Sequence, residues 1–182
     1  FKPENVLILS GDHIYKMHYG EMLKAHKESG AAVTIAVMPV PWEEASRFGI
    51  MNVDEEGTIT DFEEKPAEPK SNLASMGIYI FTYEVLKKYL EADERDPSSA
   101  NDFGKNIIPT MLENGEKMVS FRFEGYWKDV GTIHSLWEAN MDLVDQPPKF
   151  DLNDRSWSIY SRNMALAPHY VGQNAKITNS TV

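Results

Sequence analysis

The sequence predicts an α/β fold, and the prediction rests on two extended runs with a helical pattern between them. Val6–Ser10 is a largely apolar run, and Val33–Met38 is a second run rich in β-branched residues. Between them, apolar residues recur at helical spacing until Ser29 and Gly30, a typical helix C-terminus. A strand, a helix and a strand in this order form a βαβ unit with parallel strands. Because Val6–Ser10 shows no polar alternation, we expect it to be a central parallel strand buried on both faces.

The elements that follow continue to mix strands and helices. Two short extended runs flank the acidic turn Asp54–Gly57 and predict an antiparallel hairpin. Asp102 should cap a helix in which Pro109 produces a kink or a restart. The remaining predictions are a helical stretch at 43–47, strands at 50–53, 59–62, 74–81 and 119–123, and helices around 85–90, 103–112 and 132–144.

The chain divides near residue 145. Gln146, Pro147 and Pro148 form the clearest linker, and a short β-like stretch begins at Tyr170. Six residues separate Val171 from Ile177, the spacing of a hexapeptide β-helix, although one coil could not bury its own face. We therefore predict a body over residues 1–145, a linker over 146–169 and the start of a second domain over 170–182.

Composition excludes several classes of function. The 182 residues carry 18 Lys and Arg against 28 Asp and Glu, a formal charge of −10. This charge argues against a general binder of nucleic acid or membrane surfaces, because both are polyanionic. The absence of Cys removes thiol catalysis, disulfides and thiolate metal sites, and the cytoplasm is the expected location. No apolar run approaches the roughly 20 residues of a membrane span.

Asp12 is the first candidate functional residue, because Gly11 and Asp12 directly follow the first predicted strand. Ligands of open α/β sheets bind beyond the carboxyl ends of the strands, where a carboxylate is a usual Mg²⁺ ligand for a phosphorylated substrate. The alternative is that Asp12 caps the following helix. The motif alone does not separate these two interpretations.

A second candidate site lies at Phe62–Pro66. Lys65 between acidic residues and Pro66 could be a point charge for a phosphate, with Glu64 accepting hydrogen bonds from sugar hydroxyls. A solvated surface lysine is the commoner explanation of such a residue taken alone.

A third candidate site lies at Gly125–Thr132, where two aromatic residues, a carboxylate and two glycines precede a predicted helix. Trp127 could simply fill the core, but Asp129 beside Gly131 is harder to explain by packing. If Asp12 and Asp129 converge, they form a two-carboxylate site for one Mg²⁺. The five histidines lack a convincing metal-ligand spacing, and we expect them to be surface or core residues.

Five motifs occur in a fixed order along the chain. They are Leu9–Met17, Phe62–Pro66, Ser75–Tyr79, Asp102–Lys105 and Tyr126–Thr132. Together they closely resemble the bacterial glucose-1-phosphate adenylyltransferases, also called ADP-glucose pyrophosphorylases. The resemblance implies a Rossmann-like, glycosyltransferase-A-like domain with a mixed, mostly parallel sheet, followed by a left-handed parallel β-helix.

The resemblance also implies a reaction and a set of roles. The family joins ATP and α-D-glucose 1-phosphate to give ADP-glucose and pyrophosphate for glycogen synthesis, in allosterically regulated enzymes that form homotetramers or hetero-oligomers. By this likeness Asp12 and Asp129 would hold Mg²⁺, and Lys65 would serve catalysis as well as binding the sugar phosphate with Glu64. The glucose pocket would be lined by Gly49, Ser75, Tyr79, Asp102, Phe103 and Trp127.

Two alternatives to this activity stay open. The chain could belong to another sugar-nucleotide pyrophosphorylase, or to a non-catalytic regulatory subunit of the same fold; the presence of Asp12, Lys65 and Asp129 speaks against the second. The family's Gly-rich nucleotide-binding segment would precede Val6, and most of its β-helix would follow Tyr170. We therefore expect this polypeptide alone to make no ADP-glucose and to be either marginally stable or self-associating.

Overall fold

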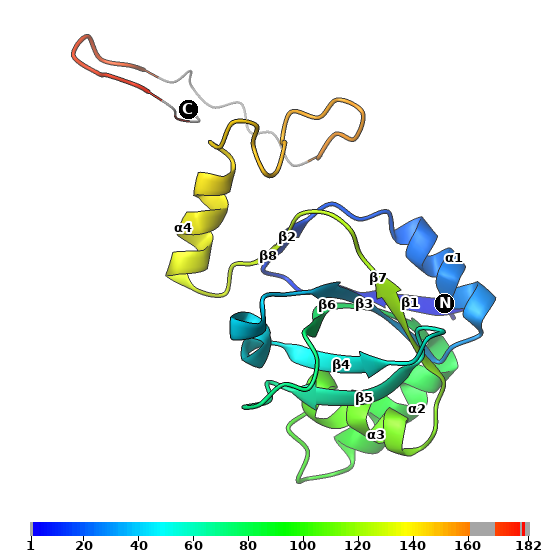
Figure 1. Cartoon of the computed structure of the whole chain (residues 1–182). Helices are drawn as coiled ribbons and strands as arrows, with labels where there is room; N and C mark the ends of the chain where they lie inside the picture. The colour runs from blue at the N-terminus through cyan, green and yellow to red at the C-terminus, as the bar shows by residue number, and fades with distance from the viewer. Residues whose placement is uncertain (1, 161–169, 179, 181–182) are drawn as a thin grey trace. The chain divides into compact units, whose positions relative to one another are not determined.

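The computed structural model describes residues 2–160, 170–178 and 180, and the chain forms two compact units. The first, here called the sheet unit, consists of residues 1–11 and 17–124, and the second, the ribbon unit, consists of residues 12–16 and 125–182. Figure 1 shows the elements of both units in chain order. The predicted boundary near residue 145 stays a prediction.

The sheet unit is built on one six-stranded mixed sheet. Its strands are β1 (Asn5–Ile8), β3 (Val33–Pro39), β4 (Gly49–Val53), β5 (Ile59–Glu64), β6 (Leu73–Thr82) and β7 (Met118–Arg122). The order is β5-β4-β6-β3-β7, and β1 pairs with the half of β6 that β4 does not reach. The predicted hairpin is confirmed as β4 and β5, which pair antiparallel from Gly49 opposite Glu64.

The prediction of a mostly parallel sheet is wrong for the described residues, where β3 and β7 form the one parallel pair of strands. The long strand β6 lies between β1 and β3 and runs antiparallel to both. The two strands of the predicted βαβ unit therefore do run in the same direction, but they are not neighbours. Local sequence predicts that two strands joined by a helix run in the same direction. It does not predict whether a strand from elsewhere in the chain lies between these two strands.

The prediction that the first strand is buried on both faces is also wrong. Leu7 is 40% exposed and Leu9, just beyond the strand, is 45% exposed. In the described part of the chain β1 pairs with β6 alone, so one of its edges has no strand beside it. An apolar run shows that a strand can be buried, whereas its burial also depends on which neighbours are present.

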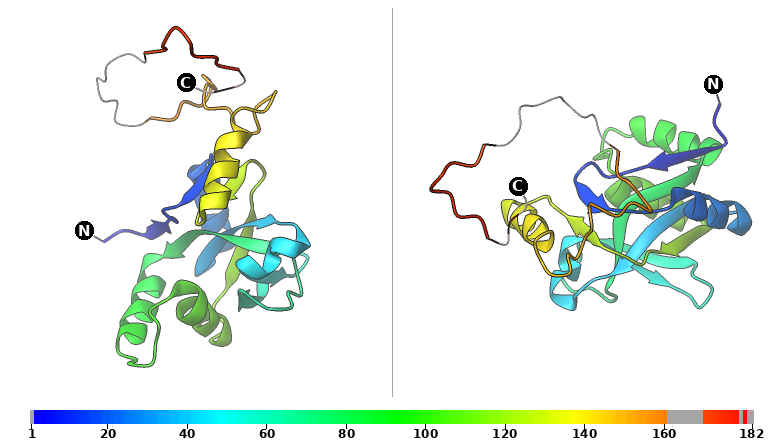
Figure 2. Two further views of the ribbon diagram at one scale, coloured as in Figure 1. Left: turned by 90° about the vertical axis from the view of Figure 1, so that its left-hand side faces the viewer. Right: turned by 90° about the horizontal axis from the view of Figure 1, so that it is seen from above.

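Helices cover both faces of this sheet, as Figures 1 and 2 show. The helix α1 (Tyr19–Ser29) contacts β3, β6 and β7, and ends at Gly30 with a left-handed φ of 61°. On the other face lie α2 (Tyr83–Glu94), the π-helical turn η2 (Phe103–Ile107) and α3 (Ile108–Glu113). A further short 3₁₀ segment, η1 (Trp42–Arg47), precedes β4.

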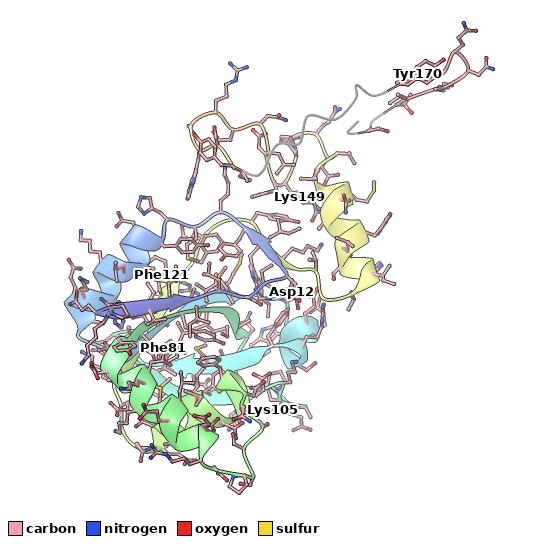
Figure 3. All side chains as sticks on the ribbon, turned by 180° about the vertical axis from the view of Figure 1, so that it is seen from behind. Asp12, Phe81, Lys105, Phe121, Lys149 and Tyr170 are labelled. Carbon is pink, nitrogen blue, oxygen red and sulfur yellow. The ribbon has the colours of Figure 1, made fainter. Side chains whose placement is uncertain are left out.

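The main hydrophobic core fills the space between the sheet and the helices α2 and α3. Phe81 of β6, which Figure 3 labels, and Met111 of α3 are both fully buried there. The predicted cap is confirmed, because the Asp102 carboxylate accepts a hydrogen bond of 2.8 Å from the backbone N–H of Lys105. The helix then restarts at Ile108 with Pro109 in its first turn, as predicted.

The ribbon unit begins with two short antiparallel strands, β2 (His13–Tyr15) and β8 (Trp127–Asp129). The helix α4 (Ile133–Asp142) follows, and Thr132 and Ser135 form a capping box at its start. The predicted helix at 132–144 is thus confirmed to within two residues, whereas the three-residue strands were not predicted.

The predicted start of a β-helix lies only partly within the described residues. Residues 170–178 and 180 contain a turn and no strand, and residues 161–169 of the predicted linker lie outside the described part. No helix among the described residues is both long and apolar enough to cross a membrane.

Candidate active site

The ribbon formed by β2 and β8 places the side chains of residues 13–15 and 127–129 on two faces. His13 pairs with Asp129, and Tyr15 pairs with Trp127. Because successive side chains of a strand point to opposite faces, these four residues share one face, and Ile14 with Lys128 takes the other.

The first face carries a compact group of possible metal ligands. Ligand atoms of Asp12, His13 and Asp129 all lie within 4.8 Å of one another. His13 Nε2 is 3.7 Å from Asp12 Oδ1 and 4.0 Å from Asp129 Oδ1. The structure therefore brings together the two carboxylates that the sequence analysis paired, and adds His13, which the sequence analysis had set aside.

Gly131 leaves space for this carboxylate pair. A Cβ at this position would lie 3.0 Å from Asp129 Oδ1 and 3.6 Å from Asp12 Oδ2, tight against the first oxygen. The Gly131 backbone N–H also donates a hydrogen bond of 2.8 Å to Asp129 Oδ1. Two carboxylates beside a residue without a side chain form a donor set of hard oxygens, which fits a cation such as Mg²⁺.

The alternative interpretation of Asp12 as a helix cap is not supported. The N-cap position of α1 is occupied by His18, and no side chain makes a capping hydrogen bond there. Asp12 instead precedes β2, and its backbone carbonyl accepts a hydrogen bond of 3.1 Å from the Val130 N–H.

Trp127 contacts the imidazole of His13 rather than filling a core. The two rings meet edge to face with centroids 5.4 Å apart. The indole Nε1–H donates a hydrogen bond of 3.4 Å to His13 Nδ1. Trp127 is half-buried, so it serves both as packing and as a polar partner.

The second face of the ribbon is held to α4 by the buried carboxylate of Asp142. This group accepts hydrogen bonds from Tyr126 at 2.8 Å, from Lys149 at 2.7 Å and from Lys128 at 3.4 Å. Burial alone would raise the pKa of Asp142, but the hydrogen bonds from Lys149 and Tyr126, with the charge of Lys128, hold that pKa below its ordinary value. Burial, together with Asp142, raises the pKa of the Tyr126 hydroxyl.

The sheet unit contains a separate pocket of about 290 Å³. Its lining combines the ends of strands with the start of η2. The lining residues are Ile8, Leu9, Ser10, Glu64, Gly77, Tyr79, Asp102, Phe103 and Gly104. Four of these, Glu64, Tyr79, Asp102 and Phe103, are predicted sugar-phosphate or glucose residues.

Glu64 lies between two glycines at one wall of this pocket. Its Oε2 atom would lie 2.9 Å from a Cβ at Gly49 and 2.5 Å from a Cβ at Gly104, so a side chain at either position would displace the Glu64 carboxylate. Burial raises the pKa of Glu64; the charge of Lys65 opposes this shift, while that of Asp102 adds to it. The carboxylate therefore lies in a partly desolvated position, where a hydrogen bond that it accepts is stronger than in water.

Lys65 adopts a strained backbone conformation beside Glu64. Its φ is +49°, a region that costs a non-glycine residue roughly 1 kcal/mol or more. The Lys65 side chain is 64% exposed, and its Nζ is 3.8 Å from Glu64 Oε1. The ammonium group thus lies near the Glu64 carboxylate and remains accessible to solvent, as binding of a phosphate requires.

Aromatic rings and a hydroxyl pair form the rest of this site. Tyr79 stacks on Phe103 with centroids 5.8 Å apart. The Tyr79 hydroxyl lies 3.5 Å from Ser75 Oγ, and burial raises the pKa of this hydroxyl. Ser75 is itself buried, so it supports Tyr79 rather than lining the pocket.

The predicted residues thus fall into two groups, one in each unit. The sheet unit carries Gly49, Glu64, Lys65, Ser75, Tyr79, Asp102 and Phe103, and the ribbon unit carries Asp12, Trp127 and Asp129. Neither the contact of His13 with the carboxylates nor the space that Gly104 and Gly131 leave beside Glu64 and Asp129 was predicted from the sequence. Each of these residues lies next to an acidic residue or within two residues of one, and this proximity in the sequence could have indicated them.

Residues 1–146 match the nucleotidyl transferase family. The whole chain is 62% identical to the glucose-1-phosphate adenylyltransferase of Clostridium beijerinckii, of which it covers 47%. It is 60% identical to the enzyme of that name from Desulforamulus reducens and 58% identical to that from Bacillus cereus, covering 46% and 48% of them. The chain therefore spans about half the length of the curated relatives it matches.

The fold and these matches define the class of protein. A mixed sheet flanked by helices, with residues 1–146 matching, shows that the chain belongs to the nucleotidyl transferase family. Among its relatives, the glucose-1-phosphate adenylyltransferases named above match it over all 182 residues.

Proposed function

We propose that this chain is part of a glucose-1-phosphate adenylyltransferase, which forms ADP-glucose and pyrophosphate from ATP and α-D-glucose 1-phosphate for glycogen synthesis. The observation that carries the proposal is the 62% identity to such an enzyme over all 182 residues. The convergence of Asp12 and Asp129 beside Gly131 supports it, because transfer of a nucleotidyl group needs a site for a phosphate-bound cation.

In this proposal Asp12 and Asp129 hold Mg²⁺. When bound, the ion would offset the charge that develops on the phosphate oxygens and on the departing pyrophosphate. Gly131 fixes Asp129 through its N–H and leaves both carboxylates unobstructed. No covalent intermediate is required, since a phosphate oxygen of the sugar phosphate attacks the α-phosphorus of ATP directly.

The pocket of the sheet unit would bind α-D-glucose 1-phosphate. Glu64 accepts hydrogen bonds from sugar hydroxyls, and the stacked rings of Tyr79 and Phe103 present an apolar surface to the sugar. Lys65 supplies a positive charge for the phosphate in both ground and transition states. Asp102 lines the same pocket, Ser75 supports Tyr79, and Gly49 lies beside Glu64. Trp127, in the ribbon unit, stays a proposed substrate residue on the family resemblance alone.

The whole protein would then have the further features that the family resemblance of the sequence implies. We propose a glycosyltransferase-A-like catalytic domain followed by a left-handed β-helix that begins near Tyr170. The protein would act in the cytoplasm as a homotetramer, or as a hetero-oligomer with a related subunit.

The proposal is tested by Asp12→Asn in the full-length polypeptide. Loss of one metal ligand should lower kcat about 10²–10³-fold while the KM for glucose 1-phosphate stays nearly unchanged, since the cation acts chiefly in the transition state. Release of pyrophosphate from ATP and glucose 1-phosphate is the measurement, repeated with other nucleoside triphosphates to separate this activity from that of other sugar-nucleotide pyrophosphorylases.

Asp151→Asn is a matched control, because Asp151 is an exposed carboxylate of the ribbon unit that accepts from the Asn153 N–H. It should leave kcat unchanged. Wild-type protein that shows no ATP-dependent release of pyrophosphate, or an Asp12→Asn variant with wild-type kcat, would contradict the proposal.

A further inference from the structure

The imidazole of His13 is placed between two different partners, and each ring nitrogen faces one of them. Nε2 faces the carboxylates of Asp12 and Asp129, at 3.7 Å and 4.0 Å. Nδ1 faces the indole of Trp127, whose Nε1–H donates to it at 3.4 Å. The register of the ribbon produces this arrangement, because His13 is directly opposite Asp129 and diagonal to Trp127.

We infer that Trp127 fixes His13 as a hydrogen-bond donor and thereby keeps the imidazole from becoming a metal ligand, which makes the cation site selective for oxygen-preferring ions. The inference rests on the proposed metal site of Asp12 and Asp129. It adds a function for two residues to which that proposal gives no role at the metal.

The hydrogen bond from Trp127 determines which nitrogen of His13 carries the proton. An indole N–H can only donate, so Nδ1 must accept with its lone pair. In the neutral ring the proton is then on Nε2, the nitrogen that lies 3.7 Å from Asp12 Oδ1 and 4.0 Å from Asp129 Oδ1. An N–H dipole this close to two anionic groups attracts them and favours their convergence.

A metal-bound histidine has the opposite pattern. It gives the lone pair of one nitrogen to the metal and donates the N–H of the other nitrogen to a neighbour. If Nε2 of His13 bound an ion, the proton would move to Nδ1 and face the Trp127 N–H. Two donors would then oppose each other across a half-buried contact, so the tautomer that metal binding needs is disfavoured.

The consequence is a choice among cations. Carboxylate oxygens suit Mg²⁺ and Mn²⁺, whereas imidazole nitrogen suits Co²⁺, Ni²⁺ and Zn²⁺, which bind most mixed sites more tightly than Mg²⁺ does. With His13 held as a donor, Asp12 and Asp129 present oxygen alone. Outer partners of a ligand typically change metal affinity about 10–100-fold, and Trp127 would be a mismatched partner of this kind if His13 bound the ion.

Trp127→Phe is the direct test, because phenylalanine keeps an aromatic ring and lacks the N–H donor. The probe is Mn²⁺ added to the full-length polypeptide, followed by electron paramagnetic resonance with detection of nitrogen-14 coupling. In the wild type, bound Mn²⁺ should show no coupling to a histidine nitrogen. In Trp127→Phe the coupling should appear, and the ratio of Co²⁺ to Mg²⁺ affinity should rise about tenfold.

Two further variants make the result specific. The double variant Trp127→Phe with His13→Gln should lose the nitrogen coupling again, since Gln offers no imidazole. Trp137→Phe is the matched control, because Trp137 is an exposed tryptophan of the same unit, and it should behave as the wild type. Circular dichroism checks that each variant is folded.

Nitrogen coupling in the wild type, or an unchanged Co²⁺ to Mg²⁺ ratio in Trp127→Phe, would overturn the inference while leaving the carboxylate site intact. Asp12→Asn separates that site from the inference, since it should abolish Mn²⁺ binding whatever the state of His13. A wild-type chain that binds no Mn²⁺ at millimolar concentration would overturn both the site and the inference.

Discussion

The two units of this chain hold their candidate functional carboxylates by different means. In the sheet unit, Glu64 ends a strand of a six-stranded sheet whose core packs against helices, and two glycines shape its surroundings. In the ribbon unit, Asp129 ends a three-residue strand that has one neighbour, and the polar group of Asp142 holds the opposite face. Apolar burial therefore positions the first site, and hydrogen bonds and ion pairs position the second.

This difference predicts that the two units fail under different perturbations. Apolar truncation should damage the sheet unit most, and loss of a single charge should damage the ribbon unit most. Hydrogen exchange measured by mass spectrometry reports on both at once, with β6 representing the sheet unit and α4 the ribbon unit.

The largest effect is expected from Phe81→Ala. Phe81 of β6 is fully buried in the core between the sheet and the helices, so its truncation should lower the free energy of unfolding of the sheet unit by about 3–5 kcal/mol. Urea denaturation followed by circular dichroism measures this loss. Leu90→Ala on the exposed side of α2 is the control and should cost less than about 1 kcal/mol. Equal losses in the two variants would contradict the placement of the core.

A smaller effect, in the other unit, is expected from Asp142→Asn. The amide keeps the size of the carboxylate and can still accept from Tyr126, but it removes the charge that pairs with Lys128 and Lys149. Amide exchange in α4 should accelerate, corresponding to about 1–3 kcal/mol, while exchange in β6 stays unchanged. Asp145→Asn, which removes only an exposed ion pair with Lys149, should change little. Faster exchange in β6 would show that Asp142 does not act on the ribbon unit alone.

The sequence was informative wherever a local pattern determines the structure. The hairpin at β4 and β5, the Asp102 cap, the restart at Ile108 and the start of α4 after Thr132 all depend on residues close together in the chain. The insertion of β6 between β1 and β3 could not be predicted in this way, because strand pairing is decided by contacts distant in sequence.

The candidate site shows the same limit at the level of single residues. Asp12, Glu64, Lys65 and Asp129 were selected from the sequence because their motifs are unusual and resemble those of a known family. His13 was not, because a three-residue strand is too short to show alternation and its register with β8 is not visible in the sequence. Its approach to Asp129 and Trp127 follows from that register alone.

Lys65→Gln tests the site of the sheet unit through substrate binding rather than through stability. Lys65 is exposed and pairs only loosely with Glu64, so the variant should fold normally. In the full-length polypeptide the KM for glucose 1-phosphate should rise about tenfold, since a charge-assisted contact to the phosphate is lost, and the KM for ATP should change little. Lys70→Gln removes a nearby exposed lysine that pairs with Glu63, and serves as the control. A defect specific to ATP would assign Lys65 to the other substrate.

The smallest expected effect is a difference between the two units in how their stability depends on pH. His26 is buried in the sheet unit, where its Nδ1 lies 2.8 Å from Thr34 Oγ1 and its Nε2 lies 3.2 Å from Thr82 Oγ1. The Thr82 hydroxyl donates to the carbonyl of Ala31, so it accepts from Nε2–H, and Nδ1 accepts from Thr34. The neutral ring is therefore satisfied on both sides, and burial lowers the pKa of His26 despite the opposing charge of Glu4.

The sign of the pH dependence follows from this lowered pKa. Below about pH 6.5 the unfolded chain binds a proton at His26 that the folded chain resists, so stability is present above that pH and is lost as the pH falls toward the lowered pKa. The pKa of Asp142 is lowered from 3.8, so Asp142 stops stabilising the ribbon unit only in solution more acidic than about pH 3.8. Between pH 7.5 and pH 5, the protection factors of the β6 amides, which correct for the intrinsic pH dependence of exchange, should thus fall while those of the α4 amides do not. His26→Gln should abolish this dependence, and His134→Gln, at an exposed histidine, should preserve it. A pH response that survives in His26→Gln would assign it to another group.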